Sequence, residues 1–272
     1  MPRRLVVNAD DFGRSHSINE AILQAHREGI LTTTSLMMNE EACDEAVALA
    51  KQNPKLGVGL HLTLLVGRSA LPPEKIPGLV NASGEFSNAP AATGFRYFAR
   101  SELREQLRAE IHEQFKRFKQ TGLTMDHVNG HLHMHMHPVV FRILMEDADR
   151  LGIRRARLTR DLFWLNARLD RGRWGYRISH ALIYTLLSRN ARRVFRERGI
   201  KHTSHVFGLL QDSHVDESFV LKLLPRLPPG DSELYSHPSL DTFKHELDAL
   251  ISPRVKEKIN VSGIKLIRYQ DL

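Results

Sequence analysis

The chain has 272 residues, of which 42% are hydrophobic and 26% charged, a composition typical of a globular protein with a sizeable core. Its one cysteine, Cys43, excludes an internal disulfide, and no apolar run is long enough to cross a bilayer or to form a signal peptide, so we expect a cytoplasmic protein. The formal net charge of +8 leaves open an anionic membrane surface or an acidic substrate, but RNA-binding and zinc-finger motifs are missing and we expect no nucleic acid.

The first predicted element is a buried strand of branched apolar residues at 5–7, which leads into two adjacent acids, Asp10 and Asp11. Apolar spacing then predicts helices at 17–29 and 41–51 and strands at 30–38 and 56–64, the second of which carries His61 near its end. Neighbouring carboxylates repel each other unless a positive group lies nearby. Asp10 and Asp11 therefore indicate either a metal site or a polar turn that caps the next helix.

Residues 69–94 are rich in Pro, Gly, Ala and Ser, which predicts a long loop inserted before the next helix. A loop of this length in a compact domain is usually functional or mobile. We interpret it as a lid over the substrate, with a tolerated surface insertion as the alternative. An amphipathic helix at 101–122 follows, and such a helix usually packs on the outside of a sheet.

The second half continues the alternation. Strands are predicted at 125–130, 153–158, 203–209, 232–236 and 264–267, and helices at 139–151, 219–224 and 243–250. Residues 160–200 form a basic, helical insertion. This order predicts an α/β fold of parallel βαβ units, either a barrel or an open doubly wound sheet, in a single domain that spans residues 1–272.

The residues suited to chemistry follow the strands. Asp10, Asp11, His61, His131 and His237 all lie at or just after strand ends, and in α/β barrels the active site is built on that face. One Asp and two His from different strands form an open ligand set that leaves room for water and substrate. A lone His on a strand is more often a structural residue, which is the alternative for His61.

Four histidines alternate with Leu and Met over residues 131–137, and in an extended chain they would point to one side. One metal site cannot use all four besides Asp11 and His61, so the others contact substrate, support a ligand or have no role, and the sequence does not rank them. With a metal bound, Asp10 could accept a proton from the attacking water and His237 could protonate the leaving group. The predicted chemistry is hydrolysis of an amide or ester.

Two other classes of function remain open. A carboxylate and two histidines also describe the iron site of a non-haem oxygenase, although an oxygenase does not need the adjacent Asp10. A non-catalytic protein that binds a sugar or lipid could keep the same fold. Oxygen dependence would reveal the first alternative, and unchanged function in Asp10→Asn would favour the second.

Four stretches of the sequence resemble those of the YdjC-like carbohydrate deacetylases, a family that includes chitooligosaccharide deacetylase. They are NADDFG at 8–13, GLH at 59–61, NGHLH at 129–133 and ELYSHP at 233–238. Within the family, the sequence is most similar to the hopanoid biosynthesis-associated branch, HpnK. The resemblance implies a deformed, TIM-barrel-like (β/α) barrel of the glycoside hydrolase and deacetylase type, one divalent metal ion, Mg²⁺ or Zn²⁺, and removal of an acetyl group from an N-acetylated sugar.

The resemblance also implies a role for each residue that matches a family position. Asp11, His61 and His131 would be the metal ligands, Asp10 the general base and His237 the general acid. The substrate would be an N-acetylated sugar, free or attached to a lipid such as an N-acetylglucosaminyl hopanoid.

Three further residues are expected to contact the substrate: Arg157, at a position where family members often have a substrate-binding arginine, and His133 and His135. Two positions depart from the family pattern. Asn129 stands where the family often has Asp two residues before the third ligand, which puts the orientation of that ligand in question. Ser239 stands where Gly often follows His-Pro, which puts the geometry of that turn in question.

The basic segment at 174–198 combines an apolar stripe with arginines at both ends; the stripe consists of Ile178, Leu182, Ile183, Leu186 and Leu187. Such a helix can lie in a membrane interface with its arginines on anionic head groups. The alternative is an outer barrel helix packed on its neighbours. The first interpretation predicts a peripheral protein at the inner face of the membrane, and a homodimer is left open as well.

Overall fold

The structure, a computed structural model, describes residues 2–169, 172–211 and 213–272. Its strands are β1 (Arg3–Phe12), β2 (Thr33–Leu36), β3 (Gly57–Leu62), β4 (Met125–Gly130), β5 (His205–Phe207), β6 (Gly230–Ser236) and β7 (Ile264–Ile267). Its α-helices are α1 (His16–Glu28), α2 (Cys43–Gln52), α3 (Pro90–Ala99), α4 (Arg104–Gln120), α5 (Pro138–Glu146), α6 (Ala148–Leu151), α7 (Phe163–Leu169), α8 (Trp174–Glu197), α9 (Glu217–Leu223), α10 (Lys244–Ile251) and α11 (Pro253–Val261). The 3₁₀ turns are η1 (Pro73–Lys75), η2 (Ser101–Leu103), η3 (His131–Met136), η4 (Leu224–Arg226) and η5 (Tyr269–Asp271).

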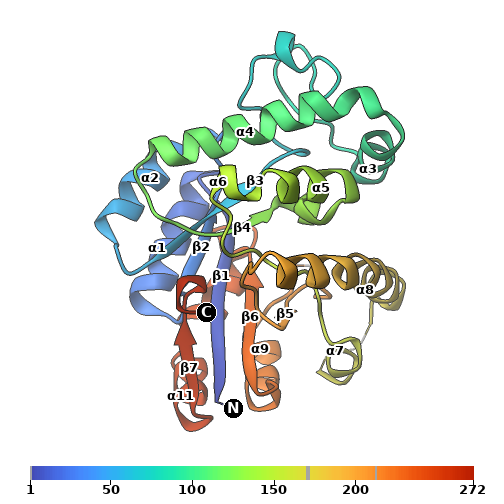
Figure 1. The fold of residues 1–272 in the computed structure, drawn as a ribbon. Coiled ribbons are helices and arrows are strands. Elements are labelled where there is room, and N and C mark those ends of the chain that lie inside the picture. The colour runs from blue at the N-terminus through green and yellow to red at the C-terminus, as the bar shows by residue number, and fades with distance from the viewer. Residues whose placement is uncertain (1, 170–171, 212) are drawn as a thin grey trace.

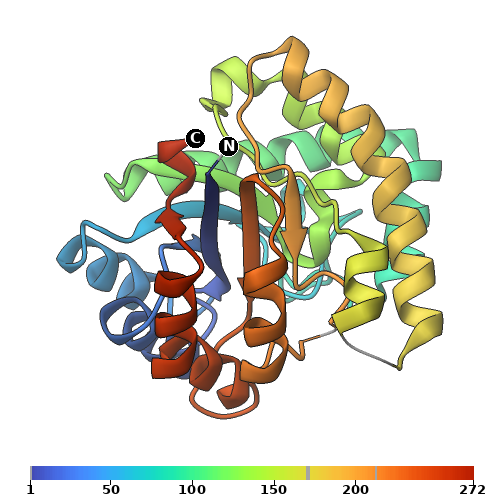
Figure 2. The same ribbon diagram turned by 90° about the horizontal axis from the view of Figure 1, so that it is seen from below.

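The strands form one curled parallel sheet. Their order is β4-β3-β2-β1-β6-β5, and β7 pairs with the first half of β1. Figures 1 and 2 place α1 and α2 on one side of β1 and α7 and α8 on the other. The alternation of strands and helices and the parallel sheet confirm the predicted α/β class.

The two edges of the sheet are linked by isolated bridges. The strand predicted at 153–158 is wrong in its extent, because this segment forms only single bridges that lead from β4 through Arg155 and Ala156 to Lys201. The segment stays short because it soon turns to another partner: the Arg160 carbonyl accepts a hydrogen bond from the Val206 amide of β5. Through these contacts the segment after α6 connects β4 at one edge of the curled sheet with β5 at the other edge, and the sheet forms a deformed barrel.

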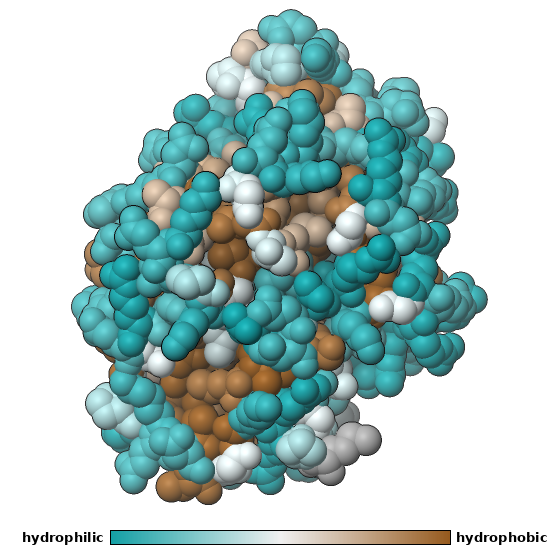
Figure 3. Space-filling view, turned by 60° about the vertical axis from the view of Figure 1, so that its left-hand side comes forward, coloured by the Kyte–Doolittle hydropathy of each residue, from teal (hydrophilic) through white to brown (hydrophobic). Residues whose placement is uncertain are grey.

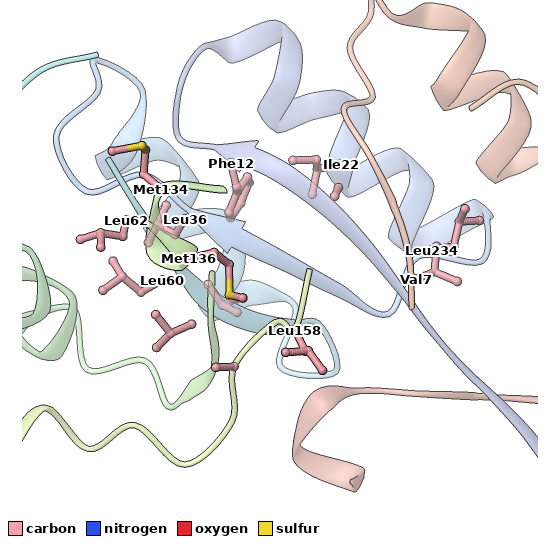
Figure 4. Packing of buried hydrophobic residues seen from close by; sticks show 14 of the residues in the cluster. Val7, Phe12, Ile22, Leu36, Leu60, Leu62, Met134, Met136, Leu158 and Leu234 are labelled. Atoms are coloured by element: carbon pink, nitrogen blue, oxygen red, sulfur yellow. The ribbon is translucent and has the colours of Figure 1, made fainter. Parts of the chain in front are cut away.

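Side chains alternate between the two faces of the sheet. The face toward the helices is apolar and includes Val7, Leu36, Leu60, Leu62 and Leu234, which Figure 4 shows with Phe12, Ile22, Met134, Met136 and Leu158. The opposite face is polar, and its buried side chains hydrogen-bond to one another across the strands; they are Asn8, Asp10, Thr33, Ser35, His61, Asn129, Arg157 and Glu233. The barrel interior therefore contains charges that must satisfy one another, because water does not reach them.

Other predictions of local structure need correction. The 131–137 stretch is not extended, because it forms η3, in which Leu132 and His133 have φ values of +47° and +59°. The helix predicted at 139–151 breaks at Asp147 into α5 and α6. The loop predicted at 69–94 ends early, because α3 begins at Pro90, a residue suited to the first turn of a helix. Helix α11 was not predicted. Residues 170 and 171 of the predicted basic insertion lie outside the described residues.

The surface shown in Figure 3 is mostly hydrophilic, and hydrophobic residues gather in hollows between the polar ones. A groove of about 510 Å³ lies beside α4 and is lined by Phe115, Phe118, Leu123 and Met125 among others. It contains none of the predicted site residues, so this groove is not the candidate active site.

Among the residues that the structure describes, no helix is both long and apolar enough to cross a membrane.

Candidate metal site

The end of β1 places two acids together. Asp11 has a φ of +67°, in the left-handed region, and the register between β1 and β2 shifts between Ala9 and Phe12. A residue in that conformation interrupts the alternation of side chains, as a β-bulge does. Asp10 and Asp11 therefore both lie buried at the carboxyl end of the strand, with 2% and 5% of their surface exposed.

Asp11, His61 and His131 converge on one point. Each offers one ligand atom, and these atoms lie within 4.8 Å of one another. Asp11 Oδ1 is 3.0 Å from His131 Nδ1 and 3.2 Å from His61 Nε2. Asp11 and His61 lie near the ends of β1 and β3, and His131 is the first residue of η3, directly after β4. A carboxylate oxygen and two imidazole nitrogens in this arrangement can share one divalent cation.

His61 is oriented by Asn129 and Ser35. Asn129 Oδ1 lies 2.7 Å from His61 Nδ1, and the Asn129 amide group donates to Asp10 and to Ser35. When Nδ1 donates its proton to Asn129, the lone pair of Nε2 faces Asp11. In this tautomer the buried His61 Nε2 has no proton to donate to Asp11 Oδ1, 3.2 Å away, and the two lone pairs face each other, which is unfavourable unless a cation lies between them. The residues therefore fit a metal ion, and Asn129 can set the His61 tautomer without being a carboxylate.

Charge also favours a cation at this point. Burial opposes ionisation of Asp11, but His131 and His61 outweigh it and hold the pKa of Asp11 well below its usual range. For His61, burial lowers the pKa of the imidazole, but the carboxylates of Asp10 and Asp11 outweigh burial and raise this pKa above its usual value. Because a protonated His61 and a bound metal ion both offset these carboxylates, proton and metal should compete for the site.

Asp10 is held by a buried arginine. Arg157 donates to Asp10 Oδ2 over 2.7 Å and to Oδ1 over 2.9 Å, and it also donates to Glu233 Oε1 over 3.0 and 2.7 Å. Burial raises the pKa of Asp10, but the nearby Arg157 guanidinium and His61 outweigh it, so the pKa lies well below its usual range. Arg157 has no exposed surface. Its guanidinium supports Asp10, and its role in substrate binding stays a prediction.

Sequence reasoning missed the far end of this network. Glu233 Oε2 accepts a hydrogen bond from the Tyr269 hydroxyl, and the Tyr269 ring stacks on His127 with ring centroids 4.2 Å apart. Both Glu233 and Tyr269 are fully buried. Burying an ionised acid within a strand costs free energy unless a positive group pairs with it. Glu233, within the predicted strand at 232–236, therefore indicated in the sequence that a basic partner such as Arg157 lies nearby.

The other histidines of η3 have separate positions. His135 Nε2 lies 3.1 Å from the Arg157 carbonyl, and His137 Nε2 lies 3.0 Å from the Gly94 carbonyl. Burial and Arg157 lower the pKa of His135 to about 3, so this ring is neutral at physiological pH. Of the four histidines, only His131 belongs to the group with Asp11 and His61. The left-handed residues of η3 explain this, because they replace strand alternation with a tight turn.

Aromatic rings border the site on the side of β6. The His133 ring packs edge-on against Tyr184 of α8 and against Tyr235, at 5.3 and 5.5 Å between centroids. The Tyr235 ring contacts His237 at 5.3 Å and lies beneath the Arg157 guanidinium at 4.7 Å. His237 is half-buried. Its role as an acid and the substrate contacts of His133 and His135 stay predictions.

Fold and site together define an α/β barrel protein with a polar interior and a candidate Asp-His-His metal site at the ends of its strands. The family model for "YdjC-like protein" matches residues 4–261. This chain belongs to the YdjC-like family.

Curated relatives agree with this assignment. The chain is 42% identical over 163 residues to the carbohydrate deacetylase of Geobacillus stearothermophilus, and this alignment covers 59% of the present chain and 62% of the relative. It is 30% identical over 288 aligned positions to the chitooligosaccharide deacetylase of Serratia marcescens, across 100% of both chains. The alignments to the first curated relatives span about 60% of their length.

A solved structure shows a similar fold. It is an Enterococcus faecalis protein named for cellobiose-phosphate cleavage, with a TM-score of 0.75, 24% identity and coverage of 100% of this chain and 99% of that one. At this identity the likeness concerns the fold alone. The HpnK branch is not tested by any of these names and stays a prediction.

Proposed function

We propose that the chain is a metal-dependent deacetylase that hydrolyses the acetamido group of an N-acetylated amino sugar. The observation that carries the proposal is the convergence of Asp11, His61 and His131 at one buried point beside a second carboxylate, Asp10. The names of the relatives, carbohydrate deacetylase and chitooligosaccharide deacetylase, support the reaction and the class of substrate.

Asp11, His61 and His131 would hold the metal ion. Two imidazole nitrogens and one carboxylate suit Zn²⁺ and similar transition-metal ions better than Mg²⁺, which prefers oxygen ligands. When bound, the ion supplies a Lewis acid for the acetyl carbonyl and lowers the pKa of water at the site.

Asp10 and His237 would move the protons. Arg157 holds the pKa of Asp10 low, so the carboxylate is unprotonated and available as an acceptor, and the same pairing weakens it as a base. In the proposal Asp10 accepts the proton of the attacking water, whose own pKa a bound metal ion would lower. Water then adds to the acetyl carbon, the C–N bond breaks, and the sugar nitrogen takes a proton. His237, the residue directly after β6, is our candidate for that donor.

Acetate release tests the proposal. Free N-acetylated oligosaccharides and glycolipids serve as substrates for the wild type, for Asp10→Asn and for Asp248→Asn, a control on the exposed side of α10. We expect a chelator to abolish release and Zn²⁺ to restore it, and we expect Asp10→Asn to bind metal yet lose about 10²–10⁴-fold in rate. Acetate release that neither the chelator nor Asp10→Asn changes would overturn the proposal, and oxygen consumption would favour an oxygenase.

The finer predictions belong to this proposal as well. They are an N-acetylglucosaminyl lipid such as a hopanoid glycolipid as the substrate, contact with the inner membrane surface, and a homodimer. The resemblance to HpnK supports the first, and helix α8 supports the second. The alternatives, a non-haem oxygenase and a non-catalytic binding protein, are not favoured, because the curated relatives reported above are named as deacetylases.

A further inference from the structure

The outer face of α8 carries a row of exposed hydrophobic side chains. They recur every four residues: Trp174, Ile178, Leu182 and Leu186, with 45%, 47%, 61% and 66% of their surface exposed. Ile183 lies beside the row and is also exposed. At 1.5 Å per residue, the row extends about 18 Å along the helix. Helices of globular proteins turn such residues toward the core, so this face indicates a missing partner.

The same face becomes basic toward the end of the helix. Arg189, Arg192 and Arg196 are exposed one to three turns beyond Leu186, and Glu197 is the one acid in the α8 sequence. A face that is apolar at one end and cationic at the other complements the interface of an anionic bilayer. Its hydrophobic side chains can enter the boundary with the acyl chains, while the arginines meet lipid phosphates.

Helix α7, which contacts α8, carries a further exposed hydrophobic side chain, Trp164, at 77% exposure. Of the eleven large hydrophobic side chains that are exposed in the described residues, six lie on α7 and α8. Figures 1 and 2 show both helices at one side of the molecule. Tryptophan is the residue most typical of a membrane interface, because its ring is apolar and its N–H can stay in contact with water.

The inner face of α8 borders the candidate site. Tyr184 packs edge-on against His133 and belongs with Ala181 to a small hydrophobic cluster around Tyr235. Leu132, next to the candidate ligand His131, is 51% exposed. The inner face of α8 therefore contacts residues that border the candidate site, while its outer face carries the exposed row. Under the proposed function, on which this point rests, a lipid-attached sugar would reach the site from the same surface.

Charge argues against a second copy of the chain as the partner. In a symmetric dimer the same surface meets itself. Parallel α8 helices would bring their arginines together, and antiparallel helices would place the arginines of each helix over the apolar half of the other, where α8 has no acid. The α8 sequence offers Glu197 alone to offset them, and Glu197 already lies 4.0 Å from Arg193. An anionic lipid surface has no such repulsion, because its phosphates oppose every arginine.

We infer that the outer face of α7 and α8 binds the surface of an anionic lipid bilayer, with α8 lying in the plane of the interface. The inference names an interaction surface and concerns neither the metal site nor the catalytic residues.

Vesicle flotation with the full chain tests the inference. The probes are vesicles of phosphatidylcholine alone and of phosphatidylcholine mixed with phosphatidylglycerol, at low and high salt. Two double variants address the two halves of the face: Leu182→Glu with Leu186→Glu, and Arg189→Gln with Arg196→Gln. Their matched controls lie on other faces: Val261→Glu, at an exposed apolar residue of α11, and Lys119→Gln with Lys265→Gln.

We expect salt-sensitive binding to the anionic vesicles. Each arginine removed should weaken binding about fivefold, so the arginine double variant should lose about 25-fold. The leucine double variant should abolish flotation, and both controls should bind like the wild type. No flotation at low salt, or equal losses in the variants and their controls, would overturn the inference. A dimer in light scattering that Leu182→Glu with Leu186→Glu converts to monomer would overturn it in favour of a protein interface.

Acetate release from a soluble oligosaccharide separates this inference from the proposed function. The α8 variants should retain that activity, because none of the changed residues lies in the candidate site. If the protein floats with vesicles but releases no acetate, the membrane-binding inference stands and the proposed function fails. If it releases acetate but does not float, the proposed function stands and the membrane-binding inference fails.

Discussion

Arg157→Met is the sharpest test of the buried network. Arg157 is fully buried between the carboxylates of Asp10 and Glu233, which are themselves at most 2% exposed. Methionine keeps much of the side-chain length but removes the charge and the donors. Removing one partner of a buried ion pair costs about 3–5 kcal/mol. Because two carboxylates lose their partner here, we expect the free energy of unfolding at neutral pH to fall by about 4 kcal/mol or more.

Urea unfolding at neutral and at mildly acidic pH measures this loss. In the wild type, Arg157 holds the pKa of Asp10 well below its unfolded value, so this stabilisation is complete above the unfolded pKa and is lost only as pH falls through the low folded one. In the variant, unpaired carboxylates take up protons at higher pH, so the difference from wild type should narrow on acidification. Arg4→Met is the control, because Arg4 and Asp231 form a partly exposed pair worth at most about 1 kcal/mol. A loss below about 1 kcal/mol at neutral pH would refute the reasoning.

Further predictions concern the metal site and its surroundings. His61→Ala should lower Zn²⁺ affinity far more than His137→Ala, whose ring contacts a backbone carbonyl; calorimetry that finds equal losses would contradict the ligand assignment. Asn129→Ala should lower Zn²⁺ affinity about 10–100-fold, because His61 loses the acceptor that orients it. Zn²⁺ affinity should fall about tenfold per pH unit below the raised pKa of His61, since the protonated ring cannot bind metal, and a flat pH profile would count against this. Tyr269→Phe should cost about 1–3 kcal/mol in thermal or urea unfolding, because Glu233 Oε2 loses its donor.

Local sequence predicted the parts of the site that lie at strand ends. The apolar run before Asp10 and the strand that contains His61 have the sequence pattern of buried strands. Because such strands pair in parallel, their carboxyl ends lie at the same edge of the sheet. The α/β class was predictable for the same reason. The convergence of Asp11, His61 and His131 follows from this parallel arrangement and is visible in the structure.

Long-range pairing was beyond local patterns. Arg157 meets Asp10 across 147 positions of the chain, and nothing in the sequence around either residue specifies that contact. The turn of η3 was missed because Leu132 and His133 adopt left-handed conformations that sequence alternation does not foresee. The strand predicted at 153–158 forms only isolated bridges. The number of backbone hydrogen bonds in a strand depends on the segments that lie beside it, and the apolar residues of the segment itself do not reveal those neighbours.

The order in which the network residues occur along the chain bears on how the protein is made. Arg157 is translated 147 residues after Asp10, and Glu233 and Tyr269 are translated later still. Until Arg157 has emerged, enclosing Asp10 would leave its carboxylate without the guanidinium, so the group would have to take up a proton or stay in contact with water. The N-terminal strand can therefore be enclosed with Asp10 in its ionised form only after the segment that carries Arg157 has been synthesised.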